Sequence, residues 1–210
     1  MQKAVIVCNG SLNTKFLYSH LDKSSFLIAA DGGANKLVKT GFYPKVIIGD
    51  MDSITKAAQK KFKNAQFIRF PREKDQIDLE LAINFCVEKK FKEILILGAV
   101  GSRADMNLTN VFLLSQLPKS VKAKIVHENQ EIFLLSKKTE IGGVPGEKVS
   151  FFPIKGDVLG LTLSGAKYEL KNYNLRFGIG IGLSNEFKSK KVEISFKSGT
   201  LLCVHFHNSF

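Results

Sequence analysis

The order of apolar and polar positions divides the chain into two parts. In the first two thirds, short runs of β-branched and other apolar residues alternate with stretches of helical periodicity. Such alternation is typical of a mostly parallel sheet with helices on both faces. The predicted strands of this part are 4–8, 26–30, 46–48, 67–70, 94–97 and 124–126.

Two helices stand out in the first part. After Lys74, apolar residues recur at i, i+3, i+4, i+7 and i+8, which is the spacing of a buried helical stripe. Those positions are Leu79, Ala82, Ile83, Cys86 and Val87. A second helix is predicted after Arg103. Its expected buried stripe is Leu108, Val111 and Phe112.

From about Glu131 onward the helical period disappears, and short apolar stretches alternate with glycine-containing turns. This pattern is typical of a small all-β domain, most simply a sandwich. The predicted strands here are 132–135, 149–153, 160–163, 192–196 and 201–206. We therefore expect an α/β domain at residues 1–128 and a β-sandwich domain at residues 129–210.

Composition excludes several classes of protein. With 210 residues, 44% of them hydrophobic and 24% charged, the chain has the profile of a globular protein with a buried core. No apolar segment approaches the length of a membrane span, and residues 1–10 indicate a first strand, not a signal peptide. The three cysteines are far apart and indicate neither disulfides nor a metal site. We expect a cytoplasmic protein with reduced, buried thiols and no membrane partner.

The formal net charge of +12 is the one compositional feature that favours a nucleic-acid partner. Most of this charge comes from lysines spread along the chain, and no basic segment carries the interleaved aromatic residues that stack on bases. We interpret the lysines as a solvated surface and expect no nucleic acid. A nucleic-acid-binding module stays open as the alternative from a different functional class.

Four acidic or glycine-rich clusters follow predicted strands or begin a predicted helix. They occupy residues 31–35, 49–53, 74–78 and 98–105. In an open α/β sheet, the loops at the carboxyl ends of the strands line the ligand crevice. Any one cluster is explained by an ordinary turn, but four in succession favour a binding site.

The carboxylates in these clusters predict a site for a hard cation. Asp50 and Asp52 are two residues apart in an extended segment or turn, and Asp75 and Asp78 have the i, i+3 spacing of neighbours on a first helical turn. Converging carboxylates repel one another unless a cation neutralises them. Because no histidine or cysteine is nearby in the sequence, Mg²⁺ is favoured over zinc. Taken alone, Asp75 is also typical of a helix N-cap.

The fourth cluster combines a strand, a glycine loop and a helix, so its backbone N–H groups are candidates to hold phosphate oxygens. It is not a Walker A sequence, since no Gly-Lys-Ser/Thr follows. Arg103 suits bidentate phosphate binding, with an ordinary surface ion pair as the alternative. Asp105, so close to a bound phosphate, predicts a metal ion between the two.

The histidines contribute little to the predicted chemistry. His205 and His207 share one face of a predicted strand, but no third metal ligand is evident near them in the sequence, and we interpret them as structural. The chain has no nucleophile elbow, no Cys-x-x-Cys pair and no Ser-His-Asp set. Group transfer without a covalent enzyme intermediate is therefore the simpler expectation.

Taken together, the motifs resemble the thiamine pyrophosphokinase family. The blocks that carry the resemblance occur in the family's order and span nearly the whole chain: 30–35, 48–53, 74–80, 98–105, 160–168 and 182–186. The resemblance implies diphosphoryl transfer from ATP to the hydroxyl of thiamine. It also implies a Mg²⁺-dependent homodimer with active sites in clefts between subunits.

The same resemblance implies roles for individual residues. The implied Mg²⁺ ligands are Asp50, Asp52, Asp75 and Asp105, which together with Asp78 and Arg103 form the implied catalytic set. The implied ATP-binding residues are Asp31, Gly32, Gly33, Asn35, Gly98, Gly101, Ser102 and Arg103. The implied thiamine-binding residues are Gln76, Asp78, Ser184 and Asn185, of which Ser184 and Asn185 would come from the other subunit.

Three positions depart from the family's pattern. Ile77, Ser102 and Met106 stand where the family usually has Thr, Gly and His. Loss of a hydroxyl and an imidazole predicts altered affinity or substrate choice. Another diphosphotransferase or a nucleotide hydrolase with the same acidic loops is the alternative within this chemical class.

Overall fold

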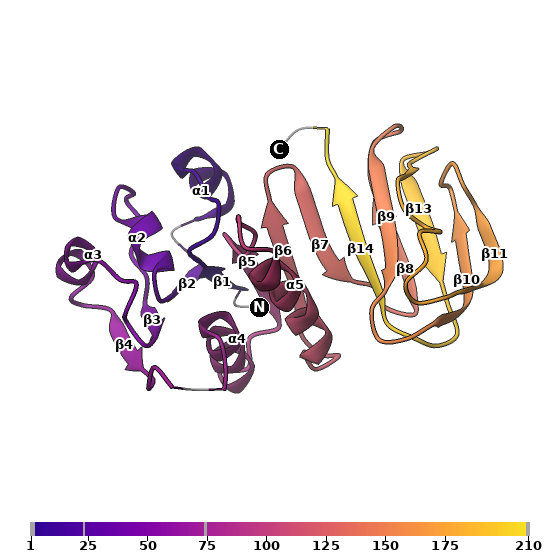
Figure 1. Cartoon of the computed structure of the whole chain (residues 1–210). Helices are drawn as coiled ribbons and strands as arrows, with labels where there is room; N and C mark the ends of the chain where they lie inside the picture. Colours follow the sequence, from indigo (N-terminus) through magenta and orange to yellow (C-terminus); the bar gives the residue numbers. More distant parts are fainter. Residues whose placement is uncertain (1–2, 23, 74, 209–210) are drawn as a thin grey trace. The chain divides into compact units, whose positions relative to one another are not determined.

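The computed structural model describes residues 3–22, 24–73 and 75–208, so Lys74 of the third acidic cluster lies outside the described residues. The chain divides into two compact units, Met1–Glu128 and Asn129–Phe210 (Figure 1). None of the helices in the described ranges combines the length and apolar content that a bilayer crossing requires. All three cysteines are buried and free, as the sequence predicted.

The first unit contains six parallel strands in the order β6-β5-β1-β2-β3-β4. Their bounds are β1 Lys3–Val7, β2 Phe26–Ala30, β3 Val46–Gly49, β4 Gln66–Arg69, β5 Glu93–Leu97 and β6 Lys122–His127. Strands β2, β3 and β4 are added in turn on one side of β1, and the chain then crosses to the other side of β1, where β5 and β6 are added. Ligands of open α/β sheets bind beyond the carboxyl ends of the strands at such a switch point.

Helices cover both faces of this sheet. They are α1 Thr14–His20, α2 Gly33–Leu37, α3 Lys56–Lys61, α4 Asp78–Glu88 and α5 Ala104–Leu113, with a 3₁₀ turn η1 at Leu114–Gln116. One buried cluster joins alternate strand residues such as Val5 and Ile47 to Leu17, Leu37 and Phe62 on α1, α2 and the end of α3. Helix α4 contacts β1, β2 and β3. This architecture confirms the predicted fold class.

Helix α4 begins later than the sequence predicted. Its first residue is Asp78 and its N-cap is Ile77, so Asp75 precedes the helix and is not on its first turn. Asp78 and Glu80 place two carboxylates in that turn, where the helix dipole favours negative charge. The apolar stripe is confirmed except at Val87, which is only half-buried.

The predicted buried stripe of α5 is wrong. Leu108 is 60% exposed and Phe112 is 48% exposed, whereas Asn110 is buried. The reason is local bonding, because Asn107 and Asn110 donate to carbonyl groups of the preceding glycine loop and so set which side of the helix faces inward. Apolar periodicity carries no information about such bonds.

The second unit consists of two antiparallel sheets, β12-β9-β14-β7 and β11-β10-β13-β8. Their apolar inner residues, among them Phe151, Leu161, Phe187 and Leu201, form one buried cluster, which confirms the predicted sandwich. The strand bounds are β7 Gln130–Leu134, β8 Lys138–Gly142, β9 Lys148–Pro153, β10 Val158–Ser164, β11 Leu170–Leu175, β12 Asn185–Glu186, β13 Lys191–Ser195 and β14 Leu201–Phe206. Strands β8, β11 and β12 were not predicted, because each ends its sheet and buries few side chains.

Candidate active site

Three aspartates meet at the carboxyl edge of the parallel sheet. Asp31 follows β2, Asp50 follows β3, and Asp78 is the first residue of α4. One carboxylate oxygen from each lies within 4.8 Å of the other two. We call Asp31, Asp50 and Asp78 the carboxylate cluster. The sequence analysis placed Asp31 and Asp50 in the loops after two strands and Asp78 on the first turn of a helix, and it did not group the three.

The backbone around the cluster is shaped to bring the carboxylates together. Asp31 has φ 39° and Met51 has φ 67°, a region that residues other than glycine adopt rarely. Between them, a Cβ at Gly49 would lie 2.7 Å from the Cβ of Asp31 and 3.0 Å from Oδ1 of Asp78. Glycine at position 49 therefore allows the close approach of two cluster members. Such strain is common at functional sites.

Hydrogen bonds fix the loop after β2 to the loop after β3. The backbone N–H of Ser53 donates to Oδ2 of Asp31 at 3.2 Å. The amide of Asn35 donates to the carbonyl of Ser53 at 2.8 Å and accepts from both the N–H and the hydroxyl of Thr55 at 2.9 Å. Asn35, predicted to bind ATP, thus has a positioning role in the structure. Gly32 and Gly33 lie in the same segment, at the start of α2.

The cluster favours a bound cation on electrostatic grounds. Asp31 is 3% exposed, and burial raises the pKa of its carboxyl; hydrogen bonds from Gly32 and Ser53 oppose this rise, while the charge of Asp78 adds to it. Among the described residues, Oδ1 of Asp31 is buried without a hydrogen-bond partner. A hard divalent cation would both neutralise the three carboxylates and satisfy that oxygen. The residues therefore fit Mg²⁺.

The thiol of Cys8 is not a nucleophile. Burial, together with the charge of Asp78, raises the pKa of Cys8 to about 12, so the thiolate is not populated near neutral pH. This agrees with the expectation of direct group transfer.

The other predicted aspartates lie outside the cluster. Asp52 donates its backbone N–H to Oδ1 of Asp50 at 3.0 Å, but its own carboxylate pairs with Arg72 at 3.0 Å on the surface. Asp75 is exposed. Gln76, predicted to contact thiamine, donates from Nε2 to Glu80 at 3.0 Å.

Arg103 and Asp105 form an exposed ion pair with each other. Nε of Arg103 lies 3.2 Å from Oδ1 of Asp105, and Nη2 lies 2.5 Å from Oδ2, while the side chains are 71% and 65% exposed. The hydrogen bonds from Arg103, with that from the Met106 N–H, hold the pKa of Asp105 below its usual range. Both groups face solvent and are accessible to a phosphate and its metal.

The glycine loop 98–103 is fixed beside β1, at the switch point of the sheet. The N–H groups of Gly10 and Ser11 donate to the carbonyls of Gly98 and Val100 at 2.8 Å. Gly98 has φ 68°, and a Cβ there would lie 2.6 Å from the carbonyl oxygen of Cys8, so glycine is required.

Asparagines of α5 complete the support of this loop. The amide of Asn107 bonds both the N–H and the carbonyl of Gly101 at 2.8 Å, and Asn110 donates to the carbonyl of Ala99 at 2.6 Å. Ser102 remains exposed at the tip of the loop. The sequence reasoning missed these two positioning residues. The available signal was a pair of asparagines three apart on the helix that follows a glycine loop.

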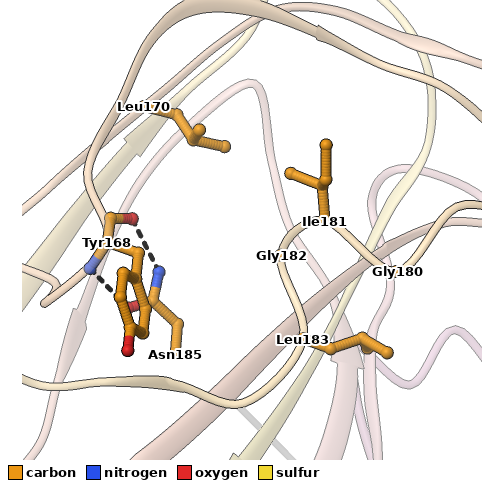
Figure 2. A pocket seen from close by; sticks show the side chains of 7 residues that line it. All are labelled: Tyr168, Leu170, Gly180, Ile181, Gly182, Leu183 and Asn185. Atoms are coloured by element: carbon orange, nitrogen blue, oxygen red, sulfur yellow. Dashed lines mark hydrogen bonds between the residues drawn. The ribbon is translucent and has the colours of Figure 1, made fainter.

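A shallow pocket of about 170 Å³ lies in the second unit (Figure 2). Its lining residues are Tyr168, Leu170, Gly180, Ile181, Gly182, Leu183 and Asn185. Sites that enclose a whole ligand are larger, roughly 300–1,000 Å³, so this pocket fits part of a ligand.

One wall of the pocket is held by Asn185, which is 2% exposed. Its Oδ1 accepts from the N–H of Tyr168 at 2.9 Å, and its Nδ2 donates to the carbonyl of Tyr168 at 2.8 Å. Ser184 has φ 50°, donates its N–H to the hydroxyl of Ser150 at 3.0 Å, and does not line the pocket. Asn185 therefore shapes the pocket, while Ser184 is exposed beside it.

Comparisons with known proteins agree across both units. The model of the thiamin pyrophosphokinase catalytic domain matches residues 17–127, and the model of the vitamin B1 binding domain of thiamin pyrophosphokinase matches residues 135–201. Thiamine pyrophosphokinase from Bacillus subtilis is 33% identical over 218 residues, which cover 97% of this chain and 98% of that protein. The chain belongs to the thiamine pyrophosphokinase family.

Solved structures of the family have the same fold. The crystal structure of the Bacillus subtilis protein has a TM-score of 0.89 at 29% identity, covering 99% of this chain and 100% of that one. The structure from Geobacillus thermodenitrificans has a TM-score of 0.85 at 27% identity, covering 99% of each chain. The resemblance that the sequence motifs indicated is thereby confirmed.

The sites described above fall inside the two thiamine pyrophosphokinase matches. The carboxylate cluster and the glycine loop lie within the catalytic-domain match, and the pocket lies within the vitamin B1 binding match. Of the three departures from the family's pattern, Ile77 is the N-cap of α4, and Ser102 and Met106 flank the ion pair of Arg103 and Asp105. All three lie next to groups predicted to contact substrate.

Proposed function

We propose that the chain transfers the diphosphoryl group of ATP to the hydroxyl of thiamine, which gives thiamine diphosphate and AMP. The observation that carries this proposal is the carboxylate cluster at the carboxyl edge of a sheet that matches the family's catalytic domain. A second domain that matches the vitamin B1 binding model supplies the preference for thiamine. The compartment that we propose is the cytoplasm.

Mg²⁺ is the proposed metal, with Asp31, Asp50 and Asp78 as its nearest carboxylates. When bound, Mg²⁺ offsets negative charge on the transferred phosphate oxygens. Asp52, Asp75 and Asp105 remain proposed ligands. Asp52 is two residues from Asp50, and its backbone N–H already donates to the Asp50 carboxylate. Asp105 must first break its ion pair with Arg103 before it can bind the metal.

Residues of the chain position ATP and its transferred group. The loop 98–103, held by β1 and α5, offers backbone N–H groups to phosphate, and Arg103 offers a planar fork for two phosphate oxygens. The thiamine hydroxyl would attack the β-phosphorus in line, with AMP as the leaving group. We assign the acceptor of the hydroxyl proton to Asp78 or Asp75.

The thiamine site would lie at the pocket of Tyr168 and Asn185, with Ser184 beside it. The chain has no tryptophan, and Tyr168 supplies an aromatic surface for a thiamine ring. Because the pocket fits only part of a ligand, we propose a homodimer in which Ser184 and Asn185 of one subunit complete the site of the other. The exposed apolar side chains of Leu108, Phe112 and Phe177 support a protein interface.

A first experiment tests the carboxylates. We expect Asp50→Asn to remove thiamine diphosphate formation while circular dichroism shows a folded chain, and Lys138→Arg, on the surface strand β8, to retain wild-type activity. Asp52→Asn tests a proposed metal ligand outside the carboxylate cluster. This variant is also expected to be inactive, because we place the Asp52 carboxylate at the metal when ATP binds. Activity of Asp50→Asn within a few-fold of wild type would reject the assignment of the metal site.

A second experiment tests the shared site. Asp50→Asn and the double variant Ser184→Ala with Asn185→Ala are each expected to be inactive as purified proteins. After subunit exchange in an equimolar mixture, half the dimers are mixed and each has one intact site, so about a quarter of wild-type activity should return. A mixture as inactive as its components, or an active monomer in sedimentation, would contradict the shared site.

A further inference from the structure

A second group of metal-ligating side chains lies in the β-sandwich unit. Glu147, His205 and His207 each offer one ligand atom, and these atoms lie within 4.8 Å of one another. Glu147 directly precedes β9, whereas His205 is on β14 and His207 follows that strand. The sequence showed two histidines on one face and no third ligand, because Glu147 is 58 residues away from His205.

The strand register brings a fourth group to the same place. His205 pairs with Glu131 of β7 across the antiparallel ladder, so their side chains share a face. Oε2 of Glu131 lies 3.8 Å from Nε2 of His207. Metal-bound imidazoles commonly have a carboxylate beside the other ring nitrogen, and Glu131 is placed to serve His207 in this way.

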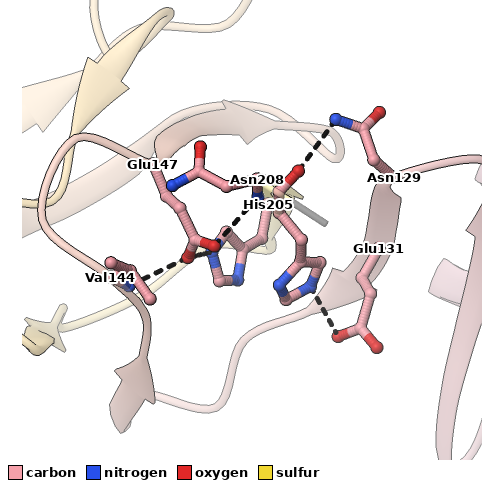
Figure 3. A network of polar contacts seen from close by, with 7 residues as sticks. Asn129, Glu131, Val144, Glu147, His205 and Asn208 are labelled. Atoms are coloured by element: carbon pink, nitrogen blue, oxygen red, sulfur yellow. Dashed lines mark hydrogen bonds and ion pairs between the residues drawn. The ribbon is translucent and has the colours of Figure 1, made fainter. Parts of the chain in front are cut away.

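Glu147 is held in a fixed orientation (Figure 3). Its Oε2 accepts from the N–H of Val144 at 2.9 Å, and its Oε1 accepts from the N–H of Asn208 at 3.0 Å. These hydrogen bonds fix the positions of both carboxylate oxygens. An ordered second shell of this kind is typical of metal sites.

The site is enclosed but open enough for an ion to enter. The side chain of His205 is 3% exposed and that of Glu147 is 6% exposed, while that of His207 is 23% exposed. Nε2 of His205 faces the carboxylate of Glu147, and the rings of His205 and His207 lie with their centroids 4.0 Å apart. Burying polar groups costs free energy, so two carboxylates and two imidazoles next to the apolar core favour a binding role over a packing role.

The distance between His205 and Glu147 needs only a small adjustment. Nε2 of His205 lies 2.9 Å from Oε2 of Glu147. With ligand bonds of about 2.0–2.1 Å, two ligands of a tetrahedral zinc ion lie roughly 3.3 Å apart, so a shift of roughly 0.4 Å converts the hydrogen bond into a shared ion.

We propose that Glu147, His205 and His207 bind one zinc ion, with Glu131 as the carboxylate partner of His207. Three protein ligands leave one tetrahedral position, toward the exposed side of His207, for water. Imidazole ligands favour zinc over Mg²⁺, which separates this site chemically from the carboxylate cluster. The ion would tie β14 to β9 and to the turn after β8.

The test is a zinc titration of the full-length, untagged protein after removal of metals with a chelator. Excess Mg²⁺ is kept present to occupy the carboxylate cluster. Calorimetry is expected to show one zinc ion per chain with micromolar or tighter affinity, and zinc is expected to raise the thermal unfolding midpoint. Co²⁺ in place of zinc should give the visible absorption of a tetrahedral site with nitrogen ligands.

Variants distinguish this site from others on the chain. His207→Ala and Glu147→Gln should each weaken zinc binding at least tenfold and lose the Co²⁺ absorption; His207 is the safer choice because it is partly exposed. His20→Ala, on α1, and Asp50→Asn, in the carboxylate cluster, should bind zinc as wild type does. No zinc binding by the wild type, equal binding by folded His207→Ala, or loss of binding in Asp50→Asn would each overturn the proposal.

Discussion

Replacement of Asp31 by asparagine should stabilise the fold while it removes activity. Asp31 is the most buried member of the carboxylate cluster, and its Oδ1 is without a hydrogen-bond partner among the described residues. An asparagine keeps an oxygen for the N–H of Ser53 and presents an N–H₂ group to Asp50 and Asp78. The substitution therefore exchanges two repulsive contacts for two potential hydrogen bonds.

The expected size of the effect follows from the separation of the carboxylates. The carboxylate oxygens lie no more than 4.8 Å apart, so at an effective dielectric constant of about 20 each pair repels by at least ~3.5 kcal/mol before screening. Asp50 and Asp78 are partly exposed, so solvent and salt reduce this value. We expect Asp31→Asn to gain about 1–3 kcal/mol of unfolding free energy at pH 7 without metal.

The gain depends on pH with a definite sign. The pKa of Asp31 is raised in the folded protein, so the fold favours the protonated acid and the wild type is penalised only where Asp31 is ionised. The penalty is absent below the ordinary aspartate pKa of about 4 and grows as pH rises through the raised value. The advantage of Asp31→Asn should accordingly shrink as pH falls from 7 toward 4.

Urea unfolding at pH 7 and at pH 4.5, with EDTA or with Mg²⁺, measures these effects. Mg²⁺ should stabilise the wild type strongly and the variant weakly, and transfer should fall by at least about a hundredfold in the variant. Asp52→Asn is the matched control and should change stability by no more than ~1 kcal/mol, since its exposed pair with Arg72 contributes little. Unchanged or reduced stability of Asp31→Asn at pH 7 in EDTA, or equal stabilisation of both proteins by Mg²⁺, would refute the reasoning.

Three further substitutions test the positioning of the site. Gly49→Ala should lower the free energy of unfolding in urea by about 1–3 kcal/mol and remove stabilisation by Mg²⁺, because its methyl group would overlap the carboxylate cluster. An unaffected variant would show that Asp31 and Asp78 do not approach position 49 closely. Arg103→Lys should leave stability nearly unchanged but raise KM for ATP or lower kcat far more than Lys138→Arg, and unchanged kinetics would remove Arg103 from the mechanism. Asn185→Ala should lower the free energy of unfolding by about 1–3 kcal/mol and raise KM for thiamine, because two backbone groups of Tyr168 lose their hydrogen-bond partner. An unchanged KM would show that the pocket does not bind thiamine.

The fold was largely predictable from sequence because apolar runs and turns are local signals. The predicted strands of both units have counterparts in the structure, with boundaries that differ by a few residues. Strands β8, β11 and β12 escaped because end strands bury few side chains and so lack clear alternation. The stripe on α5 was wrong because the inward face of that helix is set by amide bonds from Asn107 and Asn110, which hydrophobicity does not encode.

The location of the candidate site was predictable, but its membership was not. Acidic residues at strand ends indicate an edge of the sheet, and Asp50 and Asp78 were named on that basis. That Asp31 faces Asp78 depends on the order β1-β2-β3 and on the packing of α4 against these strands, neither of which is local. The approach of Glu147 to His205 likewise depends on the pairing of β9 with β14.

The most direct test of the account is the identity and ratio of the products. The purified chain is incubated with Mg²⁺, thiamine and ATP labelled at the β-phosphorus, and products are separated with and without thiamine. We predict that the label appears in thiamine diphosphate, that unlabelled AMP forms in a one-to-one ratio with it, and that AMP release stops when thiamine is omitted. Release of phosphate, diphosphate or AMP at the same rate without thiamine would contradict diphosphoryl transfer to thiamine.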